Sequence, residues 1–235
     1  MSGARTRRWH PCNEKMIKAC IFDLDGTLLN TLPTITHYVN KTITNIGLSE
    51  ITVDECRSFI GHGARRLIES ALHSKGIYDT AIIDSTLVDY NARYDADTLY
   101  LTVPYDGIVT MIDALHSAGI RLAVLSNKPD KTTNDIIAKF FPDRFSKVQG
   151  GRADLPLKPA PDALLLMIDE LGVTPDEVMY IGDTGVDIAT GKNANVYKTV
   201  GVSWGFRPVS ELRRTGADVI VDTPDLVVRE ALENA

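Results

Sequence analysis

The chain has 235 residues, of which 44% are hydrophobic and 24% are charged, an ordinary composition for a soluble globular protein. Its formal net charge of -6 and its pI near 5.4 argue against a nucleic-acid binder, which usually carries a basic excess. No apolar run approaches the length of about 18 residues that a membrane-spanning helix needs. Cys12, Cys20 and Cys56 form no CxxC pair, so neither a zinc site nor a disulfide framework is predicted and a reducing cytoplasm fits best.

The first 15 residues are basic but lack the apolar centre of a secretory signal. A second possible start, Met16, follows them directly. We therefore expect residues 1–15 to be a flexible leader that lies outside the fold.

A hydrophobic run at residues 19–22 predicts the first strand, and it leads directly into Asp-Leu-Asp-Gly-Thr. Because successive strand residues alternate sides, Asp23 and Asp25 should share a face while Leu24 points away. Two like charges held this close repel each other, and folding alone rarely calls for such a pair. The motif therefore indicates chemistry at the end of the strand.

The next 70 or so residues have a helical pattern throughout. Apolar residues at helical spacing predict one helix that ends at Gly47 and another that ends at Gly76. A third helix is predicted from about Asp84 to Tyr94. We expect residues 32–102 to form a helical cap.

Strands alternate with helices from residue 104 onward. Strands are predicted at residues 120–126 (IRLAVLS), 145–148, 178–183 (VMYIGD), 198–205 (KTVGVSWG) and 218–222 (DVIVD). This alternation predicts a parallel sheet covered by helices on both faces. The expected fold is α/β: residues 16–31 and 103–235 form a three-layer, Rossmann-like core, and the cap is inserted after its first strand.

Polar residues stand where several of these strands end, and a lysine precedes a helix in the LPLKPAPD loop. The candidates are Asp23, Asp25, Gly26, Thr27, Ser126, Asn127, Lys158, Asp183 and Asp187. The carboxyl ends of parallel strands meet at one edge of a sheet, where ligands collect. We therefore expect these side chains to converge on one site.

Such a constellation suits phosphoryl transfer. A carboxylate and a phosphate repel each other, and a hard divalent cation such as Mg²⁺ neutralises that repulsion while binding carboxylate oxygens. Asp23, Asp183 and Asp187 can supply those oxygens. Lys158 and Ser126 can hold the phosphoryl oxygens as charge builds, and a glycine beside the nucleophile lets backbone N–H groups approach them.

Four segments in this order, DLDGT, SNK, KP and GDTGVD, resemble the haloacid dehalogenase superfamily of phosphohydrolases. The resemblance runs from about residue 17 to the end of the chain, and the position of the insertion resembles that of members with a helical cap. It implies that Asp23 is a nucleophile that forms an aspartyl phosphate. It also implies that Asp25 protonates the leaving alkoxide and then deprotonates the hydrolytic water, so that a phosphoric monoester hydrolase follows more readily than a dehalogenase.

The resemblance extends to the metal and the phosphate. It implies Mg²⁺ between Asp23, the carbonyl of Asp25 and Asp183, with Asp187 in or near the same coordination shell. It implies that Ser126 and Lys158 grip the phosphoryl group. The phosphate-binding set expected from the motifs is Gly26, Thr27, Ser126, Asn127 and Lys158.

The cap carries the clues to the substrate. The segments DLDGTLLNTLP, IGHGARRLIESAL, VPYDG and LSNKPD look like the phosphoglycolate phosphatase branch of the superfamily. Arg65 and Arg66 would then lie where a loop enters a cap helix and could pair with a substrate carboxylate. Both could equally be solvated helix residues. The same stretch is no dinucleotide fingerprint, because Arg66 stands where the third glycine belongs and no strand precedes it.

Other functions remain open at this stage. A sugar-phosphate mutase would use the same nucleophile and a similar cap, and pyrophosphate or nucleoside monophosphates could also be substrates. A non-enzymatic aspartyl-phosphate switch uses similar residues, but the large insertion and the paired Asp23 and Asp25 argue against it. The expected partner is a small phosphorylated metabolite, with no nucleic acid or membrane partner, and the oligomeric state is not specified.

The arginine hypothesis makes a prediction. Replacing Arg65 or Arg66 with alanine should weaken the use of carboxylated substrates more than that of neutral ones, because only a carboxylate loses an ionic partner. Comparing kcat/KM for a carboxylated and a neutral phosphate ester checks it, and equal losses on both would remove the idea.

Overall fold

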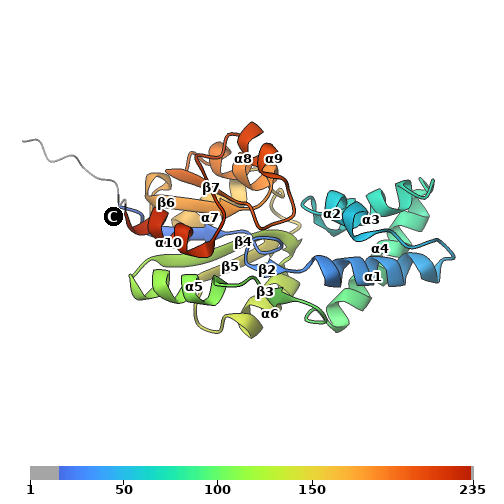
Figure 1. The fold of residues 1–235 in the computed structure, drawn as a ribbon. Coiled ribbons are helices and arrows are strands. Elements are labelled where there is room, and N and C mark those ends of the chain that lie inside the picture. Colours follow the sequence, from blue (N-terminus) through green and yellow to red (C-terminus); the bar gives the residue numbers. More distant parts are fainter. Residues whose placement is uncertain (1–15, 234–235) are drawn as a thin grey trace, which may run out of the picture.

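The computed structural model describes residues 16–233 (Figure 1). The predicted leader, residues 1–15, lies outside this range. Within it, no helix has both the length and the apolar character needed to cross a membrane.

A six-stranded parallel sheet forms the centre of the core, in the order β5-β4-β1-β6-β7-β8. The strands are β1 (Ala19–Phe22), β4 (Arg121–Pro129), β5 (Lys147–Gly151), β6 (Val178–Gly182), β7 (Lys198–Val202) and β8 (Val219–Val221). β1 lies in the middle, with Ala19 aligned to Arg121 on one side and to Val178 on the other. The predicted parallel sheet is confirmed, and its central strand is the one that leads into the paired aspartates.

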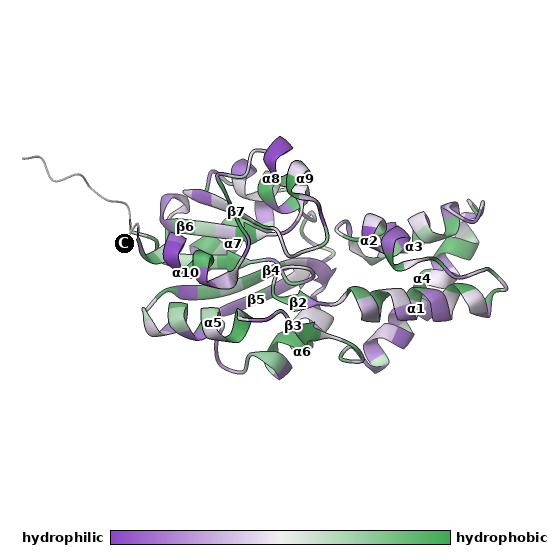
Figure 2. Cartoon of the chain, in the orientation of Figure 1, coloured by the Kyte–Doolittle hydropathy of each residue, from purple (hydrophilic) through white to green (hydrophobic). Residues whose placement is uncertain are grey.

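Alternate residues of the strands face two separate apolar layers. Cys20 and Phe22 of β1 belong to the layer under α5, α6 and α10, whereas Ala19 and Ile21 belong to the layer under α7. The core helices are α5 (Ile108–Ser117), α6 (Asp130–Phe140), α7 (Asp162–Glu170), α8 (Gly185–Asn193), α9 (Val209–Arg214) and α10 (Pro224–Leu232), with a short 3-10 turn at Pro175–Glu177. Figure 2 shows hydrophobic residues on β6 and β7 at the centre of the core and hydrophilic residues on surrounding helices such as α10. The expected three layers are present.

The cap is a separate helical unit at one end of the core (Figure 1). Its helices are α1 (Leu32–Asn45), α2 (Val53–Phe59), α3 (Gly63–His73) and α4 (Thr80–Ala96). They enclose an apolar cluster of their own, which also takes in Phe206 from the core segment after β7. Two short antiparallel strands, β2 (Leu29–Asn30) and β3 (Val103–Pro104), pair where the chain leaves and re-enters the core. The helical insertion therefore follows the first strand of the main sheet, as predicted.

Several elements differ from the sequence-based expectations. The helices α2 and α9 and the β2–β3 pair were not predicted, because they are too short for a clear hydrophobic period. The start of α2 does carry a local signal: Thr52 and Glu55 form a reciprocal capping box. The helix α4 begins earlier than predicted, because Asp79 caps it by accepting hydrogen bonds from two backbone N–H groups.

Adjacent leucines in α7 give a matched test of the packing. Leu164 is 0% exposed against the sheet, whereas Leu165 is 41% exposed. We expect Leu164→Ala to lower the free energy of unfolding by about 2–5 kcal/mol, because it leaves a cavity in the core. Leu165→Ala should change it by less than about 0.5 kcal/mol. Urea denaturation of both variants checks the difference, and similar losses would contradict the packing described.

Candidate active site

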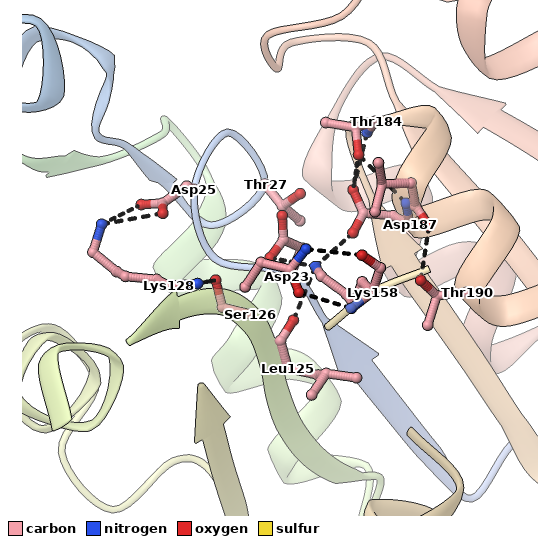
Figure 3. A network of polar contacts seen from close by, with 12 residues as sticks. Asp23, Asp25, Thr27, Leu125, Ser126, Lys128, Lys158, Thr184, Asp187 and Thr190 are labelled. Atoms are coloured by element: carbon pink, nitrogen blue, oxygen red, sulfur yellow. Dashed lines mark hydrogen bonds and ion pairs between the residues drawn. The ribbon is translucent and has the colours of Figure 1, made fainter. Parts of the chain in front are cut away.

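A buried ammonium group joins two of the candidate aspartates. Lys158 Nζ lies 2.8 Å from Asp23 Oδ1 and 2.7 Å from Asp187 Oδ1. It also donates to the carbonyl of Leu125 in β4, 3.2 Å away. Figure 3 shows this network, with Asp23 following β1, Asp187 on α8 and Lys158 reaching in from its loop. The convergence expected from the strand ends is therefore present for these three residues.

Asp183, directly after β6, completes a group of three buried carboxylates. One oxygen of each of Asp23, Asp183 and Asp187 lies within 4.8 Å of the others. The Asp183 carboxylate accepts hydrogen bonds from Thr27 Oγ1 (3.1 Å) and from the backbone N–H of Phe206 (2.7 Å). These donors fix the orientation of Asp183 but bring no full positive charge to it.

The buried charges change one another's proton affinity. Burial, together with the Asp187 and Asp25 charges, raises the pKa of Asp23 to about 7 against the lowering effect of Lys158. Burial and the charges of Asp187 and Asp23 raise the pKa of Asp183 well above its usual range. Burial alone would lower the pKa of Lys158, but Asp187 and Asp23 outweigh it and raise the pKa well above its ordinary value. The single positive charge of Lys158 thus neutralises only part of the negative charge of the three carboxylates.

The cluster fits a divalent cation. Asp23 Oδ1 is buried against Lys158 Nζ, 2.8 Å away, and a carboxylate oxygen with one such partner retains a lone pair for another ligand. Three carboxylates within 4.8 Å offer the hard oxygen ligands that Mg²⁺ and similar ions bind. A dication there would offset the repulsion that the single ammonium leaves.

Glycines form the walls beside Asp183. Gly26 has a φ of +90°, and a Cβ placed on it would overlap the Asp183 carboxylate. A Cβ on Gly205 would also overlap the Asp183 side chain. Because these positions carry no side chain, the loops after β1 and β7 can close tightly around the carboxylate.

Asp25 has a different partner from Asp23. Its two oxygens lie 3.2 and 3.1 Å from Nζ of Lys128, at the end of β4. Figure 3 shows this pair to one side of the Asp23–Lys158–Asp187 network. Asp23 and Asp25 still line the same cavity while Leu24 is fully buried. As predicted, Asp23 and Asp25 therefore lie on one side of the chain and Leu24 on the other, although both aspartates lie beyond the last residue of β1.

Asn127 connects the lysine loop with the cap. Its side-chain oxygen accepts a hydrogen bond from the backbone N–H of Lys158 (2.8 Å). Its Nδ2 donates to the carbonyls of Lys158 and Gly61, each at 3.1 Å. The side chain thus positions Lys158, and the neighbouring Ser126 is buried on the cavity wall.

A small cavity between the core and the cap contains much of this constellation. Six of the predicted site residues line it: Asp23, Asp25, Ser126, Asn127, Lys158 and Asp187. The cap contributes Ile35, Ile60, Leu67, Tyr90 and Tyr94, among others. The cavity volume is about 60 Å³. Polar residues of the core line one side of the cavity, its floor, and largely apolar residues of the cap line the opposite side, its roof.

The other predicted residues lie outside the cavity lining. Gly26, Thr27 and Asp183 stand behind it, where Thr27 donates to Asp183. Arg65 pairs with Asp84 at 2.8 Å and Arg66 with Glu69 at 2.9 Å, on the exposed surface of the cap. The structure therefore does not bring the two arginines to the site.

One core segment links the site to the cap. Phe206 donates its backbone N–H to Asp183 and buries its ring in the apolar cluster of the cap. The next residue, Arg207, donates to the main-chain carbonyls of Arg57 and Ser58 in the last turn of α2 and of Ile60 directly after it. We name Phe206–Arg207 the cap clasp, since it touches the carboxylate cluster and the cap at once.

Sequence reasoning missed Lys128, Thr184 and the cap clasp. Lys128 could have been found, because it stands two residues after Ser126 and strand alternation puts both on one side. Thr184 caps α8 and donates to Asp187 Oδ2 (2.7 Å), and its Thr-x-x-Asp spacing is a helix-start signal. The cap clasp has no local signal, since its partners are about 150 residues away in the chain.

Known proteins resemble this chain over most of its length. Residues 20–202 match the haloacid dehalogenase-like hydrolase family. A phosphoglycolate phosphatase of Rhodospirillum rubrum is 34% identical over 205 residues, covering 84% of this chain and 85% of the relative. An N-acetylmuramic acid 6-phosphate phosphatase of Pseudomonas aeruginosa is 31% identical over 210 residues, covering 88% and 92%.

Solved structures agree with these matches. The crystal structure of a Lactobacillus delbrueckii protein, provisionally assigned as a phosphoglycolate phosphatase, superposes with a TM-score of 0.87. It is 30% identical and covers 92% of this chain and 99% of its own. The chain therefore belongs to the haloacid dehalogenase-like hydrolase family. It is a phosphatase of that family, a phosphoric monoester hydrolase.

The carboxylate cluster predicts a metal-dependent stability. A divalent cation at about 100 times its dissociation constant should add about 2.7 kcal/mol, which for a domain of this size raises Tm by about 5–10 °C. Thermal unfolding with and without MgCl₂ or MnCl₂ measures it. Asp183→Asn should lose most of the rise, while Asp135→Asn, on the exposed surface of α6 and paired with Lys131, should keep it. A rise that survives in Asp183→Asn would contradict the site.

Proposed function

We propose that this protein is a Mg²⁺-dependent phosphatase that hydrolyses a small phosphorylated metabolite of the phosphoglycolate kind through an aspartyl-phosphate intermediate. The observation that carries the proposal is the placement of Asp23. It lies on the floor of the cavity, in contact with Lys158 and grouped with two further buried carboxylates. A second carboxylate, Asp25, lines the same cavity.

The residues suggest roles for each step. A carboxylate oxygen of Asp23 attacks phosphorus, the bond from phosphorus to the ester oxygen breaks, and protonated Asp25 gives its proton to the departing alkoxide. Asp25 then takes a proton from water as the water attacks the aspartyl phosphate. The bond from phosphorus to the Asp23 oxygen breaks, and inorganic phosphate and free Asp23 result.

The surroundings of Asp23 support these roles. Lys158 lies where it can hold a phosphoryl oxygen next to Asp23, and the buried Ser126 hydroxyl lines the same cavity. Mg²⁺ bound by Asp23, Asp183 and Asp187 would supply the positive charge that lets an anionic phosphoryl group approach a carboxylate. Asn127 keeps Lys158 in place through both ends of its amide.

The cavity favours a small substrate. A volume of about 60 Å³ corresponds to about four to six water molecules, which suits a short-chain phosphate ester better than an amino-sugar phosphate. Relatives that act on phosphoglycolate and on N-acetylmuramic acid 6-phosphate are about equally similar to this chain. The cavity volume therefore supports the smaller of these two substrate classes.

The mutase alternative has less support. A β-phosphoglucomutase from Clostridium difficile has a TM-score of 0.74 to this chain but is only 20% identical, a likeness that bears on the fold alone. A mutase would return the phosphoryl group to a sugar, whereas the proposed enzyme releases inorganic phosphate.

The mechanism predicts the behaviour of an Asp23 variant. Asp23→Asn should lower phosphate release from p-nitrophenyl phosphate or phosphoglycolate by about 10³-fold or more, because the amide is no nucleophile. Asp113→Asn, which removes a surface carboxylate paired with Arg144, should retain activity. Phosphate release is measured over many turnovers, which a persistent phospho-switch could not sustain.

Metal removal gives the companion result. EDTA should abolish turnover of the unmodified enzyme and MgCl₂ should restore it. Full activity in Asp23→Asn, or activity indifferent to the chelator, would overturn the mechanism.

A further inference from the structure

A second buried lysine lines the cavity, and the proposed phosphoryl chemistry does not use it. Among the residues that line the cavity in the described part of the chain, only Lys128 and Lys158 carry cationic side chains. Lys158 contacts Asp23, Asp187 and a main-chain carbonyl, and the proposed mechanism already assigns it to the phosphoryl group. Lys128 is 9% exposed and lies at the end of β4, facing the cap.

The contacts of Lys128 leave it free to take another anion. Its Nζ is 3.1 and 3.2 Å from the two Asp25 oxygens, longer than a tight charge-assisted pair. It also lies 4.4 Å from the centre of the Tyr94 ring. Tyr94 lines the same cavity, and its buried hydroxyl has no hydrogen-bond partner among residues 16–233. One wall of the cavity thus carries an ammonium group and a hydroxyl group that can each form a further polar contact.

The position of Lys128 relative to Asp25 defines which part of a substrate it meets. A general acid must come within about 2.6–3.2 Å of the ester oxygen that it protonates. Lys128 adjoins that acid, so its ammonium faces the leaving group rather than the phosphoryl group. In a 2-phospho-acid the carboxyl carbon is only two bonds from the ester oxygen, so its carboxylate would lie on the same side of the phosphate as a cation beside Asp25.

We propose that Lys128 is the specificity residue of this site and pairs with a carboxylate carried on the carbon next to the phosphate ester. The substrate class is therefore short 2-phospho-acids rather than neutral phosphate esters. This inference rests on the proposed phosphatase function and deepens it. It also moves carboxylate recognition from Arg65 and Arg66, which pair with acidic residues on the cap surface, to the core.

Two esters of equal chain length test the proposal. Phosphoglycolate and 2-hydroxyethyl phosphate differ in carrying a carboxylate or a hydroxymethyl group at the same place. The unmodified enzyme should prefer phosphoglycolate in kcat/KM. In Lys128→Met this preference should fall by about 10- to 100-fold, the value of one charge-assisted hydrogen bond, while Lys128→Arg, which keeps the charge, should retain part of it.

A neighbouring lysine supplies the matched control. Lys131 on α6 has a side chain that is 85% exposed and pairs with Asp135, and Lys131→Met should leave the preference unchanged. Thermal unfolding of all three lysine variants shows whether each is folded.

Three results would overturn the proposal. Equal losses on both esters in Lys128→Met would mean that Lys128 only positions Asp25. An unmodified enzyme without a preference for phosphoglycolate would remove carboxylate recognition altogether. A loss of preference in Arg65→Ala but not in Lys128→Met would return that recognition to the cap surface.

Binding measurements separate this inference from the proposed function. Calorimetry in the Asp23→Asn background, with MgCl₂ present, compares the affinities of the two esters without turnover. If the unmodified enzyme hydrolyses neither ester, the phosphatase proposal on these substrates fails. A Lys128-dependent preference in binding would still support the specificity role, and its absence would overturn it.

Discussion

The arrangement of this enzyme depends on one electrostatic constraint, the burial of three carboxylates around a single ammonium group. Asp23, Asp183 and Asp187 approach within 4.8 Å of one another, and Lys158 balances only part of their charge. Burial makes that imbalance costly, because little water reaches the cluster to screen it. Hydrogen bonds from Thr27, Thr184 and the backbone of Phe206 hold the carboxylates in place. The chain thus maintains a site of high negative charge that a divalent cation would relieve.

Much of the core could be predicted from the sequence, since hydrophobic runs alternate with helical periods and the polar motifs follow the runs. The parallel sheet, the cap insertion and the convergence of Asp23, Lys158 and Asp187 all follow from that pattern. The sequence predicted less about features that depend on contacts between residues far apart in the chain. Arg65 and Arg66 have the right chemistry for a carboxylate, but α3 turns them toward Asp84 and Glu69. No local pattern reveals which face of a cap helix will meet the core.

The two proposed catalytic aspartates show how a parallel sheet separates two tasks within three residues. Asp23 lies with Asp183, Asp187 and Lys158, whereas Asp25 lies with Lys128 near the cap. In the proposed mechanism, the same spacing would place the nucleophile on the phosphoryl side and the acid on the leaving-group side. Each aspartate has its own lysine, and the two lysines come from different segments. The loop before α7 supplies one, and the end of β4 supplies the other.

The cap clasp has a consequence for how such an enzyme can diversify. Arg207 holds the cap through the carbonyls of Arg57, Ser58 and Ile60, and every amino acid carries a carbonyl. Exchange of the Arg57, Ser58 or Ile60 side chain therefore leaves the acceptors of these Arg207 hydrogen bonds in place. The polar part of the attachment thus tolerates sequence change in the cap, whereas the Phe206 ring still requires apolar cap side chains around it.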